Sequence, residues 1–224
     1  MTLEPFPVPL RQRETQRVPP FMTSRNVEGI RVCFDHDATL EFEKFKTEYT
    51  EVFRHTRQAI GHLLQKYGQV PIWLFGKNSP HVQYGIQKII DDGCEPEDPE
   101  EGIAFYGSFR FEFDGKEHRQ ECSVFIVNLE RAILGEYIND DRGDFWCGHA
   151  TVFVHELSHS ICDQIDGEKF TEVEKAYQKT VARRDDVLRK FTVNNRRQFD
   201  GHHWVNADEF LAYTMEALHS RSNW

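Results

Sequence analysis

The feature that most constrains this chain is a predicted helix over residues 149–166, which carries His155, Glu156 and His159 in the pattern H-E-x-x-H. Apolar residues recur along it at intervals of three and four, the periodicity of an amphipathic helix. They are Ala150, Val154, Leu157, Ile161 and Ile165. Gly167 follows and can adopt the left-handed conformation that ends a helix. We therefore predict a packed helix with the two histidines beside its apolar stripe.

The spacing of the two histidines indicates a metal site. Residues four apart lie one turn apart on the same helix face, so His155 and His159 can direct two imidazole nitrogens at one ion. Zinc binds histidine readily. Glu156 is rotated by about 100° from His155, away from direct coordination and toward a water molecule on the metal. That is the position of a general base.

A catalytic zinc site has three protein ligands and a fourth position for water, so another ligand must come from elsewhere in the chain. A metzincin would have a histidine six residues after His159, but Ile165 occupies that position. The metzincin pattern is therefore excluded.

A second amphipathic helix, predicted over residues 206–218, offers the missing ligand. Its apolar face contains Phe210, Leu211, Thr214, Ala217 and Leu218. Asn206 or Asp208 is the predicted N-cap. Glu209 and Glu216 lie on nearly the same side of this helix, two turns apart, and either can reach the metal.

These two segments together resemble a known family. His-Glu-Leu-Ser-His at 155–159, followed by Asn-x-x-Glu-Phe-x-Ala at 206–212, is similar to the catalytic domain of anthrax lethal factor and related gluzincin metallopeptidases. The match covers only these two helices. It implies that His155 and His159 are zinc ligands, Glu156 the general base and Glu209 the third ligand.

The chain departs from that family at one position. A tyrosine seven residues before the ligand glutamate helps to stabilise the transition state there, whereas this chain has His202. A histidine can donate the same hydrogen bond to an oxyanion, so His202, His203 and Tyr213 are the candidate donors. Asp163 and Asp166 are either partners that orient a ligand histidine or solvated carboxylates near a helix end.

Composition limits the remaining possibilities. With 224 residues the chain can form one sizeable core, and its net charge of −10 argues against binding nucleic acid or an anionic membrane. No apolar run is long enough for a membrane span, and no secretory signal is visible. We predict a protein that is cytoplasmic, or exported without a recognisable signal peptide; its oligomeric state stays open.

Five scattered cysteines without a C-x-x-C pair favour a reducing compartment. Cys147 and Cys162 flank the motif, and each is either a buried free thiol or a zinc ligand. Residues 1–28 contain Pro5, Pro7, Pro9, Pro19 and Pro20, which predicts an extended N-terminal arm before a domain over 29–224.

The other predicted elements follow from hydrophobic periodicity and turn residues. They are strands at 30–34 and 70–75, a helix over 40–67, a helix from Ser79-Pro80 to Gly93, hairpin strands at 102–113 and 121–129, a helix over 129–138, a polar loop over 139–148, and a helix from a Thr171-x-x-Glu174 capping box to about 191. In zincin peptidases, which this order resembles, an edge strand binds the extended substrate. Part of 103–113 or 121–128 is the expected substrate strand.

Together these features predict an α+β, zincin-like single domain with a small mixed sheet, packed helices and a catalytic Zn²⁺. The expected activity is hydrolysis of a peptide or protein substrate. One alternative is an interaction protein with a structural zinc, in which Cys147, Asp163 or His203 would be a fourth ligand. The other is a metal-dependent hydrolase that acts on a non-peptide amide. Neither substrate nor cleavage specificity follows from the sequence.

Overall fold

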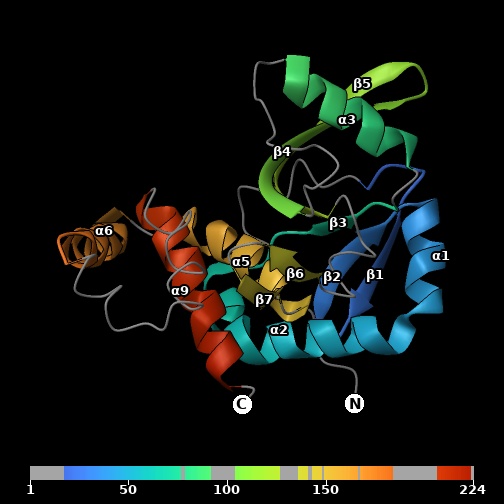
Figure 1. Cartoon of the computed structure of the whole chain (residues 1–224). Helices are drawn as coiled ribbons and strands as arrows, with labels where there is room; N and C mark the ends of the chain where they lie inside the picture. Colours follow the sequence, from blue (N-terminus) through green and yellow to red (C-terminus); the bar gives the residue numbers. More distant parts are fainter. Residues whose placement is uncertain are drawn as a thin grey trace.

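The computed structural model describes residues 18–76, 79–91, 104–126, 136–140, 143–147, 149–165, 167–183 and 206–222. Figure 1 shows a mixed sheet surrounded by helices, compatible with the predicted α+β class. In chain order the elements are β1 Thr23–Val27, β2 Ile30–Phe34, α1 His36–Lys44, α2 Lys46–Tyr67, β3 Ile72–Leu74, α3 Pro80–Asp91, β4 Ala104–Phe113, β5 Lys116–Ile126, β6 Glu136–Asp140, β7 Gly143–Cys147, α5 His149–Cys162, α6 Gly167–Val181 and α9 Ala207–Ser222.

The main sheet has five strands in the order β1-β2-β3-β5-β4. The central pairs β2–β3 and β3–β5 are parallel, whereas the outer pairs β1–β2 and β4–β5 are antiparallel. β4 is therefore an edge strand, and β5 lies inside the sheet where it pairs with β3. The strands β6 and β7 form a separate two-stranded hairpin.

The centre of the sheet is buried on both faces. In β3, Ile72 and Leu74 pack in one cluster with apolar residues of α1, α2 and α5, whereas Trp73 belongs to a second cluster with Phe109 and Phe111 of β4. A continuous apolar run without polar alternation is typical of such a strand. This burial explains why Ile72–Leu74 forms the middle of the predicted strand 70–75.

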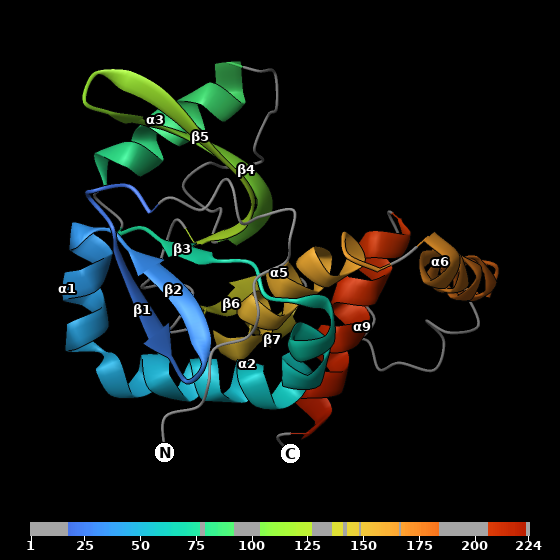
Figure 2. The same cartoon turned by 180° about the vertical axis from the view of Figure 1, so that it is seen from behind.

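The motif helix α5 runs through the middle of the molecule. Phe153, Val154, Leu157 and Ile161 are buried, and the Phe153 and Phe53 rings lie 5.1 Å apart, which packs α5 against α2. Burying one such aromatic side chain stabilises the fold by roughly 1.5–3 kcal/mol. α9 packs along α5, and Figures 1 and 2 both show it beside α5. The predicted apolar stripe is thus the surface that fixes α5 in the core.

Two helix boundaries differ from the prediction. α5 ends at Cys162 rather than at 166, because the backbone N–H groups of Gln164 and Ile165 bond to the Ile161 carbonyl in a tight terminal turn. The predicted helix 171–191 begins at Gly167 as α6, and Thr171 donates to the Gly167 carbonyl instead of capping. Residues 184–191 lie outside the described part of the chain.

The predicted helix 40–67 is two helices. α1 begins at His36, where the Ala38 N–H donates to the Asp35 carboxylate at 2.7 Å, and the helix breaks at Phe45. Figure 1 shows α1 turned steeply away from α2. The Phe42 ring packs against Phe34 of the sheet and against Tyr49 of α2, at 4.9 and 5.2 Å. Tertiary packing therefore sets a break that no glycine or proline marks.

The region before the motif is also different. Residues 136–140 form β6, although the sequence predicted the end of a helix to 138 and a loop from 139. Residues 143–147 form β7 rather than part of that loop. Residues 127–135 are outside the described part. The hairpin predicted at Asp114-Gly115 is confirmed: both residues have positive φ, 53° and 67°, as a tight β-turn of this kind requires.

The N-terminal part of the chain contributes to the sheet. Residues 23–27 of the predicted arm form β1, which pairs with β2, while residues 1–17 lie outside the described part. Among the described helices, none is both long enough and apolar enough to cross a membrane.

Candidate metal centre

Two helices bring the predicted donors together. His155 and His159 lie one turn apart on α5, and Glu209 lies in the first turn of α9. The Glu209 N–H donates to the Asn206 side-chain oxygen at 2.8 Å, so Asn206 is the N-cap that the sequence offered as one of two alternatives. This cap fixes the start of α9 and, with it, the direction of the Glu209 side chain.

The three donor side chains enclose one small volume. His155 Nε2 and His159 Nε2 are 3.2 Å apart, and the Glu209 oxygens lie 3.5 Å from the first nitrogen and 3.6 Å from the second. Ligands bound at 2.0–2.1 Å in a tetrahedron are separated by about 3.3–3.4 Å. The spacing and the donor types therefore fit zinc, and within the described part of the chain these three form the group able to hold a metal.

The charges of the metal-free site are strongly coupled. The hydrogen bond with His155 lowers the pKa of Glu209. Burial by itself would lower the pKa of His159, but the hydrogen bond to Asp208 and the charge of Glu156 outweigh it and raise that pKa. The site thus brings together a carboxylate and imidazole groups, and a divalent cation that binds them would displace their protons.

Glu156 lies beside the donor group without belonging to it. Loss of solvent around its carboxyl raises the pKa, and the charges of His155 and His159 oppose this shift. The backbone N–H of Tyr106 in β4 also donates to this carboxyl. The predicted base is therefore in contact with the edge strand of the main sheet.

Sequence reasoning missed Asp208. Its Oδ2 lies 3.2 Å from His159 Nδ1, the ring nitrogen opposite the donor group. The predicted partner Asp163 is exposed and accepts a hydrogen bond from the Tyr106 hydroxyl at 2.6 Å instead, while Asp166 lies outside the described residues. Helical geometry directs the residue before Glu209 about 100° away from it, but the contact with His159 depends on how α9 docks on α5.

The other predicted site residues fall into two groups. The Tyr213 ring lies edge-on to His155, with centroids 4.6 Å apart, one turn beyond Glu209 on α9. His202 and His203 are outside the described part of the chain, as are the side chains of Glu216 and Cys147. Tyr213 is therefore the candidate oxyanion donor that the structure places beside the histidines.

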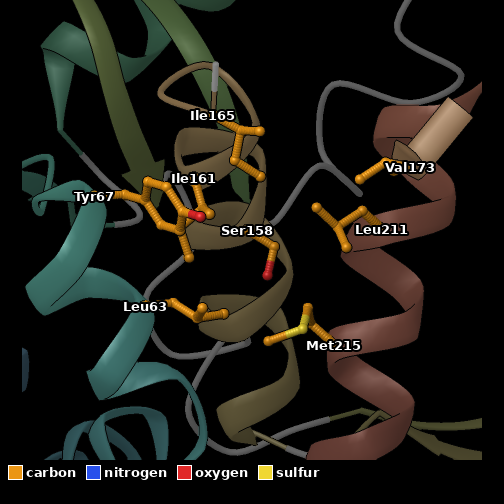
Figure 3. A pocket seen from close by; sticks show the side chains of 8 residues that line it. All are labelled: Leu63, Tyr67, Ser158, Ile161, Ile165, Val173, Leu211 and Met215. Carbon is orange, nitrogen blue, oxygen red and sulfur yellow. The ribbon is translucent and has the colours of Figure 1, made fainter. Parts of the chain in front are cut away.

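A separate apolar cavity of about 130 Å³ lies between α2, α5, α6 and α9 (Figure 3). Its lining is Leu63, Tyr67, Ser158, Ile161, Ile165, Val173, Leu211 and Met215. The Ser158 hydroxyl is satisfied by the Val154 carbonyl at 2.6 Å. None of the three donor residues lines this cavity, which is a feature of helix packing.

Comparisons with protein-family models, with curated proteins and with solved structures give no match to this chain. The function must therefore be argued from the site itself.

Proposed function

We propose that this protein is a zinc-dependent metallopeptidase with a zincin-like fold, and that it cleaves a peptide or protein substrate. One observation carries the proposal: His155, His159 and Glu209 place three donor atoms at the spacing of a tetrahedral site while Glu156 lies beside them. Two histidines and a glutamate with an open fourth position are the ligand set of catalytic zinc in peptidases.

The zinc would be held by the two imidazole Nε2 atoms and the Glu209 carboxylate. When bound, it lowers the pKa of a coordinated water to roughly 7 and polarises a substrate carbonyl. Glu156 would act as the general base that takes a proton from the attacking water and then gives it to the leaving amine. Burial raises the pKa of Glu156 in the metal-free site, and the charge of a bound zinc would act in the opposite direction.

The edge strand β4 is the proposed site for the substrate backbone. β4 packs on α5, and its Tyr106 N–H reaches the Glu156 carboxyl. An extended peptide that pairs with this edge would lie along α5, with a carbonyl near the donor group. β5 is paired on both sides over residues 124–126 and has no free edge there. Of the two predicted substrate strands, β4 is therefore the better candidate for pairing with a peptide.

Tyr213 is the proposed donor to the oxyanion. Its ring contacts His155, and its phenol is able to donate a hydrogen bond. A phenol that donates one hydrogen bond to a developing negative charge contributes to transition-state stabilisation. Tyr213→Phe should therefore lower kcat while leaving zinc content unchanged.

The decisive experiment measures zinc content and cleavage of a peptide library for the wild type, Glu156→Gln, Glu209→Ala and the control Glu172→Ala. Glu172 is exposed on α6 and outside the site. We expect one zinc and cleavage in the wild type and in the control. Glu156→Gln should keep zinc and lose cleavage, and Glu209→Ala should lose zinc.

Two results would redirect the proposal. Bound zinc without cleavage, and an effect of Glu156→Gln on stability alone, would support an interaction protein with a structural zinc. Bound zinc with activity confined to non-peptide amides would support the other hydrolase. A wild type that binds no zinc would refute both the zinc peptidase and the interaction protein with a structural zinc.

A further inference from the structure

We propose that Asp208 is a positioning residue that holds His159 in the tautomer and orientation required for metal binding. The inference rests on the metal site of the proposed function but not on peptidase activity. Asp208 immediately precedes the ligand Glu209, and the two carboxylates contact opposite nitrogens of one ring: Asp208 Oδ2 lies 3.2 Å from Nδ1, and Glu209 Oε1 lies 3.6 Å from Nε2 of His159.

The chemistry of the contact fixes the tautomer. An ionised carboxylate only accepts hydrogen bonds, so the Asp208 contact requires a proton on His159 Nδ1. In the neutral ring, Nε2 then carries the lone pair. Because Nε2 faces both His155 Nε2 and Glu209, this lone pair points into the donor group. Asp208 thus selects the form of His159 that can bind a cation.

The surroundings of Asp208 favour a positioning role over simple stabilisation of α9. Its Oδ1 is buried without a full hydrogen bond from any described residue, and the Cys162 thiol beside the carboxylate is a weak donor. A buried carboxylate oxygen that lacks a full hydrogen bond lowers the stability of the folded protein. Helix capping does not require the residue either, since Asn206 already provides it.

The thiol has a defined place in this arrangement. Cys162 is buried three residues after His159, and its interaction with Asp208 ties the carboxylate to the same helix that carries the histidines. His159, Asp208 and Cys162 therefore form a chain that runs from the donor group into the α5–α9 interface. Partners of this kind typically alter metal affinity by about 10- to 100-fold.

The test measures zinc affinity by competition with a chromophoric chelator for the wild type, Asp208→Asn, Asp208→Ala and Glu168→Gln. Glu168 is an exposed first-turn acid of α6, so it controls for charge at a helix N-terminus without a histidine contact. We expect affinity to fall by about 10-fold in Asp208→Asn and up to about 100-fold in Asp208→Ala. The control should match the wild type.

A second readout does not depend on metal. Nitrogen-15 NMR of the metal-free protein at pH 8.5 should find His159 protonated on Nδ1 in the wild type and shifted toward the Nε2–H form in Asp208→Ala. Circular dichroism verifies that each variant is folded. Zinc affinity of Asp208→Ala within about threefold of the wild type, or His159 protonated on Nε2 in the wild type, overturns this inference alone. Absence of zinc binding by the wild type overturns the metal site as well.

Discussion

Replacing Ala212 by leucine tests whether packing of α9 against α5 holds the three donor atoms together. Ala212 is fully buried, one turn after Asp208 on the same face of α9. Asp208 and Glu209 both reach histidines of α5, so the buried Ala212 side chain also faces α5. A larger side chain there must either be squeezed or push the two helices apart.

The size of the effect follows from thermodynamic linkage. Extra methylene groups in a packed interior cost about 1–3 kcal/mol, and a shift of α9 is the simplest way to relieve that strain. Zinc requires the original spacing of 3.2–3.6 Å between donor atoms. Zinc binding must therefore return α9 to its original position, where the larger side chain is strained again. A coupling of this size corresponds to an affinity loss of about 5- to 150-fold.

Chelator competition measures this loss directly, and thermal unfolding followed by circular dichroism gives the stability of each variant. Ala176→Leu, at an exposed position of α6, is the matched control and should bind zinc like the wild type. If Ala212→Leu folds and keeps zinc affinity within about twofold of the wild type, the spacing of the donors does not depend on the α5–α9 contact and the reasoning fails.

Three further predictions concern protonation, thiols and packing. Burial would lower the pKa of His159, but its contacts with Asp208 and Glu156 raise it. The ionised ring therefore stabilises the metal-free protein below pH 6.5, and this contribution is lost as pH rises through the raised pKa. Zinc needs the neutral ring, so zinc affinity should rise over that same interval; chelator competition between pH 6 and 8 that found a constant affinity would contradict this. Burial raises the pKa of the Cys33 and Cys162 thiols, so alkylation mapped by mass spectrometry should label neither cysteine in the native protein. Rapid labelling of either cysteine in the native protein would contradict this prediction. A Cβ at position 85 would clash with the Phe109 ring, so urea unfolding of Gly85→Ala should reveal a destabilisation of about 1–3 kcal/mol despite the better helix propensity of alanine. A more stable variant would disprove the close approach of Gly85 to Phe109.

The sequence predicted the parts of the site that depend on local spacing. His155 and His159 share a face because of helical geometry alone, and the Asn206 cap follows from residue type. The strand at 30–34 and the turn at Asp114-Gly115 were predicted for the same reason.

Features set by tertiary contacts were not predictable. The break at Phe45 depends on the fit of α1 between the sheet and α2, and no residue type signals it. Residues 136–147 were predicted as the end of a helix and a loop. Instead, β6 and β7 pair as antiparallel strands, so their structure depends on contacts between the two segments. Short apolar runs do not distinguish these states. The Asp208 contact exists only because α9 docks on α5 at one particular rotation.

The position of the donor residues along the chain determines when the site forms. His159 and Glu209 are separated by 50 positions, with α6 between them. During synthesis or refolding, α5 can pack on α2 well before α9 arrives, and at that stage only two of the three donors are present. If α9 docks after the rate-limiting step, metal acts on the lifetime of the folded state: it slows unfolding and leaves the folding rate nearly unchanged.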